Sequence, residues 1–236
     1  MGTDNKRYER RMGWILIWVG ILVVTVSGSA MADTQQVDHM NHAKELLGKS
    51  YRKIVLDRVG NVDHFEAWLE VQVADSLQGK WKRRSHEVAR AIMEESSKYK
   101  FDPVFLMAVI QNESSFNPTI RGTSGEIGLM QVLPTTAQWI AKRNGLQWEG
   151  EKTLLDPVKN IRIGSAYMAF LRERTAAQGG LYLAAYNMGL KNVYRALKKD
   201  VHPKDYAIRV MQRYIKFYGK MPAAASREDR MIASIR

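Results

Sequence analysis

The chain has 236 residues, of which 45% are apolar and 25% charged, with 36 basic against 24 acidic residues and no cysteine. This composition excludes an intrinsically disordered chain and predicts one substantial packed domain with a small extension. Because the sequence has no cysteine, it can form neither a disulfide nor a lipid-modified cysteine. The net charge of +12 favours an anionic partner, such as a cell-wall polymer, lipid head groups or nucleic acid, without choosing among them.

The first 32 residues have the order of a secretory signal peptide. Basic residues precede an apolar run at 14–26, and the small residues Ala30 and Ala32 stand where cleavage is expected. The run has 13 residues, whereas a membrane-spanning helix needs about 20. We therefore predict cleavage after Ala32 rather than a retained anchor, which lowers the net charge of the mature chain to +10.

Apolar residues recur at three-and-four spacing along nearly all of the mature chain, as in Phe65, Trp68, Leu69 and Val73. No run of strand alternation exceeds a few residues. These patterns predict an all-α fold with helices of about 10 to 16 residues.

Helix boundaries are marked by proline and glycine. Asp102 and Asp156, each followed by proline, have the pattern of an N-cap with proline in the first turn. The glycine at 145 and the glycine pair at 179–180 predict helix ends.

One carboxylate falls on the apolar stripe of the helix predicted to begin at Pro103. Leu106, Val109, Ile110 and Glu113 stand at i, i+3, i+4 and i+7 and so share a helix face. Burial disfavours the charged form of a carboxyl group and raises its pKa toward the range of a usable general acid. Glu113 is therefore the candidate catalytic residue. The alternative is a helix end that faces solvent or caps a neighbour.

A loop poor in side chains follows, with three glycines between Gly122 and Gly128. Glycine allows a ligand to approach the backbone closely, so a sugar chain could lie against exposed peptide groups there. Gln131, just beyond, offers both a donor and an acceptor, which suits an acetamido group. Any one of these glycines could also mark an ordinary turn.

Three motifs resemble the successive signatures of the soluble lytic transglycosylase family, whose catalytic domain is lysozyme-like. They are ESSFNP at 113–118, GEIGLMQ at 125–131 and AYNMG at 185–189. Each motif alone is modest, but three in this order and spacing are highly specific. The resemblance covers roughly residues 85–218.

We therefore predict a helical N-terminal extension at 33–84, a lysozyme-like helical catalytic domain at 85–220 and a C-terminal tail at 221–236. The segment 33–84 carries no motif that indicates a function.

The resemblance implies cleavage of the β-1,4 bond between N-acetylmuramic acid and N-acetylglucosamine in peptidoglycan glycan strands. In such enzymes the first-motif glutamate, here Glu113, protonates the leaving oxygen. It then takes the proton of the 6-hydroxyl of the same muramic residue as a 1,6-anhydro ring closes. Because the substrate carries the nucleophile, no second catalytic carboxylate is needed, whereas most glycosidases use two.

The resemblance also places residues along the sugar cleft. The substrate-binding candidates are Gln131, Tyr186, Ser114, Asn187, Ser124, Tyr206 and Met130. Tyr186 would orient Glu113 or the acetamido group through its hydroxyl. The alternative for Tyr186 is a core tyrosine whose hydroxyl has one partner.

Two positions depart from the family pattern. Gly122 stands where many members have a serine, which puts a usual hydroxyl contact in doubt, although Ser124 follows closely. Glu126 stands where alanine is common. Glu126 is then either a solvated loop acid or a second carboxylate, which would favour hydrolysis as in goose-type lysozymes.

Two other functions stay open at this point. One is a hydrolytic muramidase, whose products would carry reducing ends. The other is a weakly active peptidoglycan-binding accessory of a secretion or envelope machine, with 33–84 as its docking part.

The remaining features predict no cofactor and no metal. His39 and His42 lack a third ligand, and export argues against a nucleic-acid partner for the basic and aromatic segment 80–84. The predicted signal peptide and the absence of cysteine favour a soluble periplasmic protein, with no membrane span after cleavage.

Overall fold

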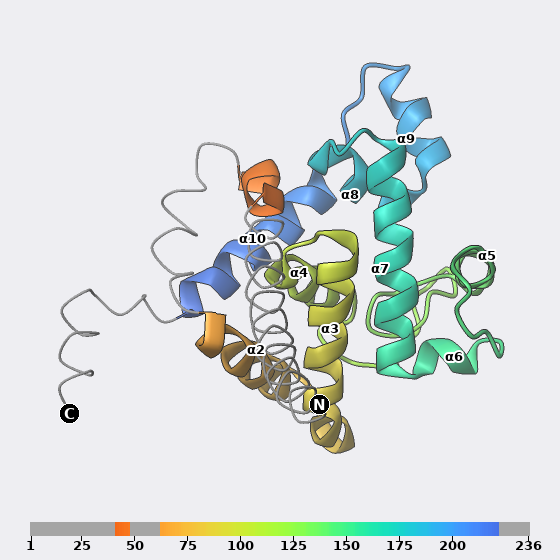
Figure 1. The fold of residues 1–236 in the computed structure, drawn as a ribbon. Coiled ribbons are helices and arrows are strands. Elements are labelled where there is room, and N and C mark those ends of the chain that lie inside the picture. The colour runs from red at the N-terminus through yellow and green to blue at the C-terminus, as the bar shows by residue number, and fades with distance from the viewer. Residues whose placement is uncertain (1–40, 48–61, 222–236) are drawn as a thin grey trace, which may run out of the picture. The chain divides into compact units, whose positions relative to one another are not determined.

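The computed structural model describes residues 41–47 and 62–221, and this part of the chain is built of helices and loops (Figure 1). Within the described residues, the only β-type backbone pairings are two isolated bridges, between Arg121 and Ile127 and between Ile127 and Val132. The all-α prediction is confirmed. The predicted signal peptide at 1–32 and residues 222–236 of the predicted tail lie outside the described residues, and the boundary at residue 84 stays a prediction.

Residues 41–47 are helical, and the elements that follow in chain order are α2 (Val62–Ser76), the 3-10 helix η3 (Gly79–Arg84), α3 (Ser85–Tyr99), α4 (Pro103–Ser114), α5 (Pro134–Asn144), α6 (Lys152–Leu155), α7 (Pro157–Arg174), α8 (Gly179–Met188), α9 (Leu190–Leu197) and α10 (Asp205–Lys220). Both predicted caps are confirmed. The Asp102 carboxylate accepts from the amide of Val104 at 2.8 Å, and that of Asp156 accepts from the amide of Lys159 at 2.9 Å.

Of the two predicted helix ends, the first is confirmed and the second is wrong. Gly145 ends α5 in the left-handed conformation, with φ of 65°. The glycine pair at 179–180 instead opens α8, and α7 ends at Arg174 after 18 residues. The next residues explain the start of α8, because Tyr182 and Leu183 are buried and draw the glycines into the first turn.

α4 is the central helix of the core. Leu106, Val109 and Ile110 are buried as predicted, but the other faces of the helix are buried as well from Pro103 to Ile110. Such a helix lies inside a domain rather than on its surface. Glu113 is partly exposed because it stands in the last turn, where α4 leaves the core.

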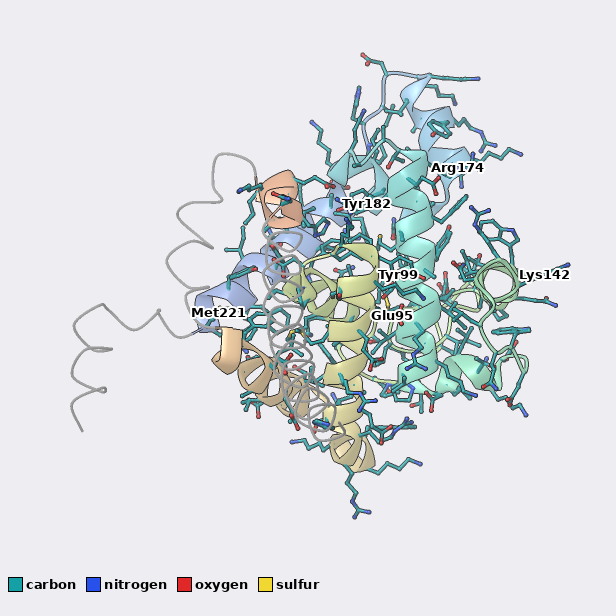
Figure 2. The ribbon with its side chains drawn as sticks, viewed as in Figure 1. Glu95, Tyr99, Lys142, Arg174, Tyr182 and Met221 are labelled. Atoms are coloured by element: carbon teal, nitrogen blue, oxygen red, sulfur yellow. The ribbon has the colours of Figure 1, made fainter. Side chains whose placement is uncertain are left out.

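Helix α10 packs along α4, and α3 packs between α2 and α7, while α7 also contacts α5 and α8. Figure 1 shows α3 and α7 running side by side. Figure 2 shows the side chains on this framework, with Lys142 of α5 and Arg174 of α7 at its outer edge. None of the helices in the described residues is long and apolar enough to cross a membrane.

Tyrosines of α10 hold the beginning of α4. The hydroxyl of Tyr214 donates to the buried Asp102 carboxylate at 2.6 Å, and the hydroxyl of Tyr218 donates to the same oxygen. The amide of Asp102 donates to Nδ1 of His42 at 3.0 Å, so neutral His42 carries its proton on Nε2, which donates to the Tyr182 hydroxyl at 3.0 Å. His42 therefore joins the helical segment 41–47 to the core.

Candidate active site

The carboxyl group of Glu113 lies between the end of α4 and the start of α10. The hydroxyl of Tyr206, in the first turn of α10, donates a hydrogen bond to its Oε1. The side-chain amide of Asn112 donates to the same oxygen at 3.4 Å. Tyr206 is only 4% exposed, so its ring packs in the core while its hydroxyl reaches the acid. Burial holds the pKa of Tyr206 well above its usual value, so this hydroxyl keeps its proton and remains a donor.

The surroundings raise the pKa of Glu113 above the ordinary value of a glutamate. Burial is the largest cause, and the negative charge of Glu126 acts in the same direction. The hydrogen bonds from Tyr206 and Asn112 and the positive charge of Arg209 oppose it, because each favours the charged carboxylate. A raised pKa favours the protonated form of the Glu113 carboxyl group, which is the form that general acid catalysis requires.

The loop between α4 and α5 is fastened beside this acid. Ser114 is buried, and its hydroxyl donates to the carbonyl of Leu129 at 2.8 Å and lies 3.1 Å from the carbonyl of Ile110. Ser115 and Phe116 then turn the chain with positive φ of 50° and 59°. Ser114 was predicted to bind substrate, but its hydroxyl instead forms a hydrogen bond to the backbone of the loop.

Asn160 of α7 holds the same loop from the other side. Its side-chain amide donates to the carbonyls of Ile127 at 2.8 Å and Leu154 at 2.9 Å, and its oxygen accepts from the amide of Met130 at 2.8 Å. All of these contacts are buried. Asn160 was not among the site residues predicted from the sequence, because its three partners lie in segments distant along the chain or before its own helix.

Gln131 and Met130 shape the floor of the loop. Gln131 has a positive φ of 46°, and its amide donates to the carbonyls of Gly128 at 2.9 Å and Ile120 at 3.2 Å. Its donors are therefore occupied, and its oxygen is the group left for a ligand. Met130 is fully buried against α7, where a Cβ on Gly164 would come within 2.6 Å of its sulfur.

Tyr186, in the last turns of α8, differs from the role predicted for its hydroxyl. The hydroxyl donates to the carbonyl of Met130 at 2.7 Å, so the tyrosine that bonds Glu113 is Tyr206. Burial holds the pKa of Tyr186 well above its usual value, and the charge of Glu113 adds to the effect. Asn187 is exposed at the end of α8.

Gly122 and Glu126, the two departures from the family pattern, lie next to each other in space. The Oε2 of Glu126 accepts from the amide of Ser124 at 3.0 Å. A Cβ on Gly122 would lie 2.3 Å from this Oε2 and 2.9 Å from Oε1 of Gln131. The glycine thus leaves the space that the carboxylate fills, and Glu126 is half-buried rather than fully solvated. Ser124 itself is exposed, and the contact that the structure gives it comes from its backbone.

Sequence reasoning brought together Glu113, Tyr206, Tyr186 and the loop, and the structure groups them at one end of α4. It missed Arg209, which follows Tyr206 on α10 and acts on the charge of Glu113. In residues 41–47 and 62–221, no three histidine or acidic side chains form a group that could hold a metal ion.

Comparison with known proteins agrees with this architecture. The family model for the transglycosylase SLT domain matches residues 90–209. A membrane-bound lytic murein transglycosylase C of Cronobacter sakazakii is 30% identical over 162 residues, which cover 61% of this chain and 44% of the relative. The corresponding protein of Photorhabdus laumondii is 35% identical over 127 residues, or 50% of this chain and 36% of the relative.

Among solved structures, the 70 kDa soluble lytic transglycosylase of Escherichia coli superposes with a TM-score of 0.51 at 24% identity, covering 69% of this chain and 30% of that one. This likeness shows the lysozyme-like helical fold. The chain thus matches less than half the length of each of these relatives. The family model spans half of the chain and contains both Glu113 and Tyr206, and the chain therefore belongs to the transglycosylase SLT domain family.

Proposed function

We propose that this protein is a peptidoglycan lytic transglycosylase, which cleaves the β-1,4 bond between N-acetylmuramic acid and N-acetylglucosamine and leaves a 1,6-anhydro end. The observation that carries the proposal is the carboxyl group of Glu113, which has a raised pKa, a tyrosine donor and a glycine-containing loop beside it. The names of the relatives, which are lytic murein transglycosylases, support the same substrate.

In the first step, protonated Glu113 gives its proton to the glycosidic oxygen as the bond from that oxygen to C1 of the muramic residue breaks. The carboxylate so formed accepts the hydrogen bond of Tyr206, which stabilises its charge. Positive charge develops on the sugar, and the negative carboxylate close to it stabilises that charge.

In the second step, the Glu113 carboxylate removes the proton of the 6-hydroxyl, and O6 forms a bond to C1. This closes the anhydro ring and returns Glu113 to its protonated form, so no water is consumed. One residue acts as acid and then as base. The oxygen of Gln131, whose N–H groups donate to the loop, accepts a hydrogen bond from an acetamido N–H.

The decisive variant is Glu113→Gln, which keeps the shape of the side chain and removes its titrating proton. General acid and general base catalysis each contribute about 10² to 10⁴ in rate, and this residue would supply both, so we expect a loss at or beyond the upper end of that range. The measurement is mass analysis of muropeptides released from purified sacculi, with circular dichroism and sacculus binding as controls for folding.

The same products separate the two enzyme classes. Wild-type protein that releases anhydromuropeptides supports the proposal, whereas products one water heavier, with reducing ends, would identify a hydrolytic muramidase. A folded Glu113→Gln variant with full activity would rule out Glu113 as the acid.

A further inference from the structure

A pocket of about 370 Å³ is lined by residues of α2, α4 and α10. It is lined by Ser76 of α2, Gln111 of α4 and residues of α10 that include Arg213, Lys216 and Lys220. Figure 1 shows the C-terminal part of α10 reaching α2 at this place. The volume falls in the range of small-ligand sites, about 300 to 1,000 Å³.

The residues that line the pocket have a net positive charge. It holds three cationic side chains and no acidic one. Elsewhere basic residues pair with acids, as Arg84 does with Asp156 at 2.8 Å and Arg121 with Glu151 at 2.9 Å. Within the described ranges, no carboxylate forms an ion pair with any of the three pocket cations. The pocket is therefore suited to a ligand that brings its own carboxylates.

The same charge continues along α10 to the catalytic acid. Arg209, Arg213, Lys216 and Lys220 stand at i, i+4, i+7 and i+11, so they share one helix face, here called the basic stripe. The guanidinium of Arg213 donates to the carbonyl of Arg209 at 3.1 Å. The stripe begins at Arg209, whose positive charge acts on the carboxyl group of Glu113.

We propose that this pocket and the basic stripe bind the carboxylate-bearing stem peptide that peptidoglycan carries on its muramic residues. The inference rests on the proposed function, since the glycan must first lie over Glu113. The reach is sufficient: ten residues of α10 separate Tyr206 from Lys216, or about 15 Å at the helical rise. An extended peptide of five residues spans up to about 17 Å.

The geometry favours a peptide over an anionic membrane surface. A lipid surface contacts a broad convex face, whereas these cations line a hollow that also offers the side-chain amides of Gln111 and Gln212 and the ring of Phe217. Amides suit the backbone of a peptide, and a buried aromatic ring suits its short apolar side chains.

The test compares two substrates that differ only in the peptide: glycan strands with their stems, and the same strands stripped by an amidase. The variant is Arg213→Gln/Lys216→Gln/Lys220→Gln. The control, Lys82→Gln/Lys142→Gln/Lys198→Gln, removes the same charge from exposed positions on η3, α5 and the end of α9. We expect the ratio of kcat/KM for the stem-bearing to the stripped strand to fall about tenfold in the pocket variant and to hold in the control.

An unchanged ratio, or an equal fall in the control, would overturn the proposal. Should the triple variant not fold, Lys216→Gln alone, at an exposed position, carries the same test with a smaller expected fall.

A second measurement separates this inference from the proposed function. The free stem tetrapeptide is titrated into full-length Glu113→Gln protein and followed by nuclear magnetic resonance. Salt-sensitive shifts on α10, lost in the pocket variant, support the pocket even if wild-type protein cleaves neither strand. Saturation of the same residues by anionic lipid vesicles, with no response to the peptide, would instead make this a lipid-binding face and contradict the proposal.

Discussion

At the scale of single residues, two tyrosine hydroxyl groups at the candidate site form hydrogen bonds to different partners. Tyr206 donates to the carboxyl group of Glu113, and Tyr186 donates to the backbone carbonyl of Met130 in the neighbouring loop. The first bond fixes the orientation of the acid and stabilises its charged form. The second fixes the loop against which the sugar would lie. The two hydroxyl groups therefore hold different parts of the candidate site, the acid and the loop beside it.

Glu126 is the residue whose role most needs measurement. Its charge raises the pKa of Glu113, so the variant Glu126→Gln should lower that pKa. Activity is lost when the acid deprotonates, so the high-pH limb of the kcat/KM profile should move to lower pH. At the optimum we expect a loss of less than about tenfold, because Glu113 keeps both proton transfers.

A Cβ at Gly122 provides the matched experiment for Glu126. Gly122→Ala leaves the charge in the chain but displaces the carboxylate from its present place, which lies 2.3 Å from the new Cβ. Its pH profile should shift in the same direction as that of Glu126→Gln. If Glu126→Gln proved as damaging as Glu113→Gln with folding intact, the single-carboxylate mechanism would be wrong and a two-carboxylate hydrolase would be the better account.

At the scale of elements, α10 holds both ends of α4. Tyr206 bonds Glu113 in the last turn of α4, and Tyr214 and Tyr218 bond its cap residue Asp102. Burial raises the pKa of Asp102 to about 6, even though the two hydroxyl groups favour the charged carboxylate. The Asp102 carboxylate is therefore well hydrogen-bonded, but burial of its negative charge is unfavourable.

This cap gives the fold a pH dependence of definite sign. The folded state binds the Asp102 proton more tightly than the unfolded chain, so the stabilisation is present at pH values below the usual aspartate range. It is lost as the pH rises through about 6. Relative to Asp102→Asn, the wild-type free energy of unfolding should fall by up to about 3 kcal/mol between pH 4 and pH 7.

Urea titrations of both proteins across this pH range provide the measurement. Asp75→Asn, at an exposed position on α2, is the control for the loss of one carboxylate. An Asp102→Asn curve parallel to the wild-type curve would show that the cap does not titrate in this range.

At the scale of the whole molecule, we expect the net charge to affect binding to the proposed substrate, peptidoglycan. The mature chain predicted from the sequence carries +10, and exposed charges are screened by salt. Binding to whole sacculi should therefore weaken as salt rises, while turnover of short glycans without stem peptides should barely change. Pull-down and turnover measured over the same salt series would test this, and equal sensitivity would place the charge effect in the sugar cleft.

The sequence predicted local features well, because neighbouring residues determine them. Asp102 and Asp156 cap helices as their following prolines indicated, and the motif glutamate lies with its loop. The apolar spacing correctly predicted that burial raises the pKa of Glu113, but it did not predict that α4 is buried on every face from Pro103 to Ile110. Spacing describes one helix and cannot tell how many neighbours surround it.

Long-range pairings were beyond the sequence for a related reason. Tyr186 and Tyr206 were both candidates, and only the packing of α8 and α10 decides which hydroxyl reaches Glu113. Gly122 and Glu126 were noticed as separate departures from a pattern. Their shared space became visible only when the loop was folded.

The hydrogen bonds from α10 to both ends of α4 also determine when these contacts can form during synthesis of the chain. Glu113 stands 93 residues before Tyr206, and Asp102 stands 112 residues before Tyr214. A growing chain that has made α4 but not α10 therefore lacks the hydrogen bond from Tyr206 to Glu113 and the two tyrosine hydrogen bonds to Asp102. Because α10 is the last helix described, the hydrogen bonds from its tyrosines to Glu113 and Asp102 form only after almost all of the described domain has been synthesised.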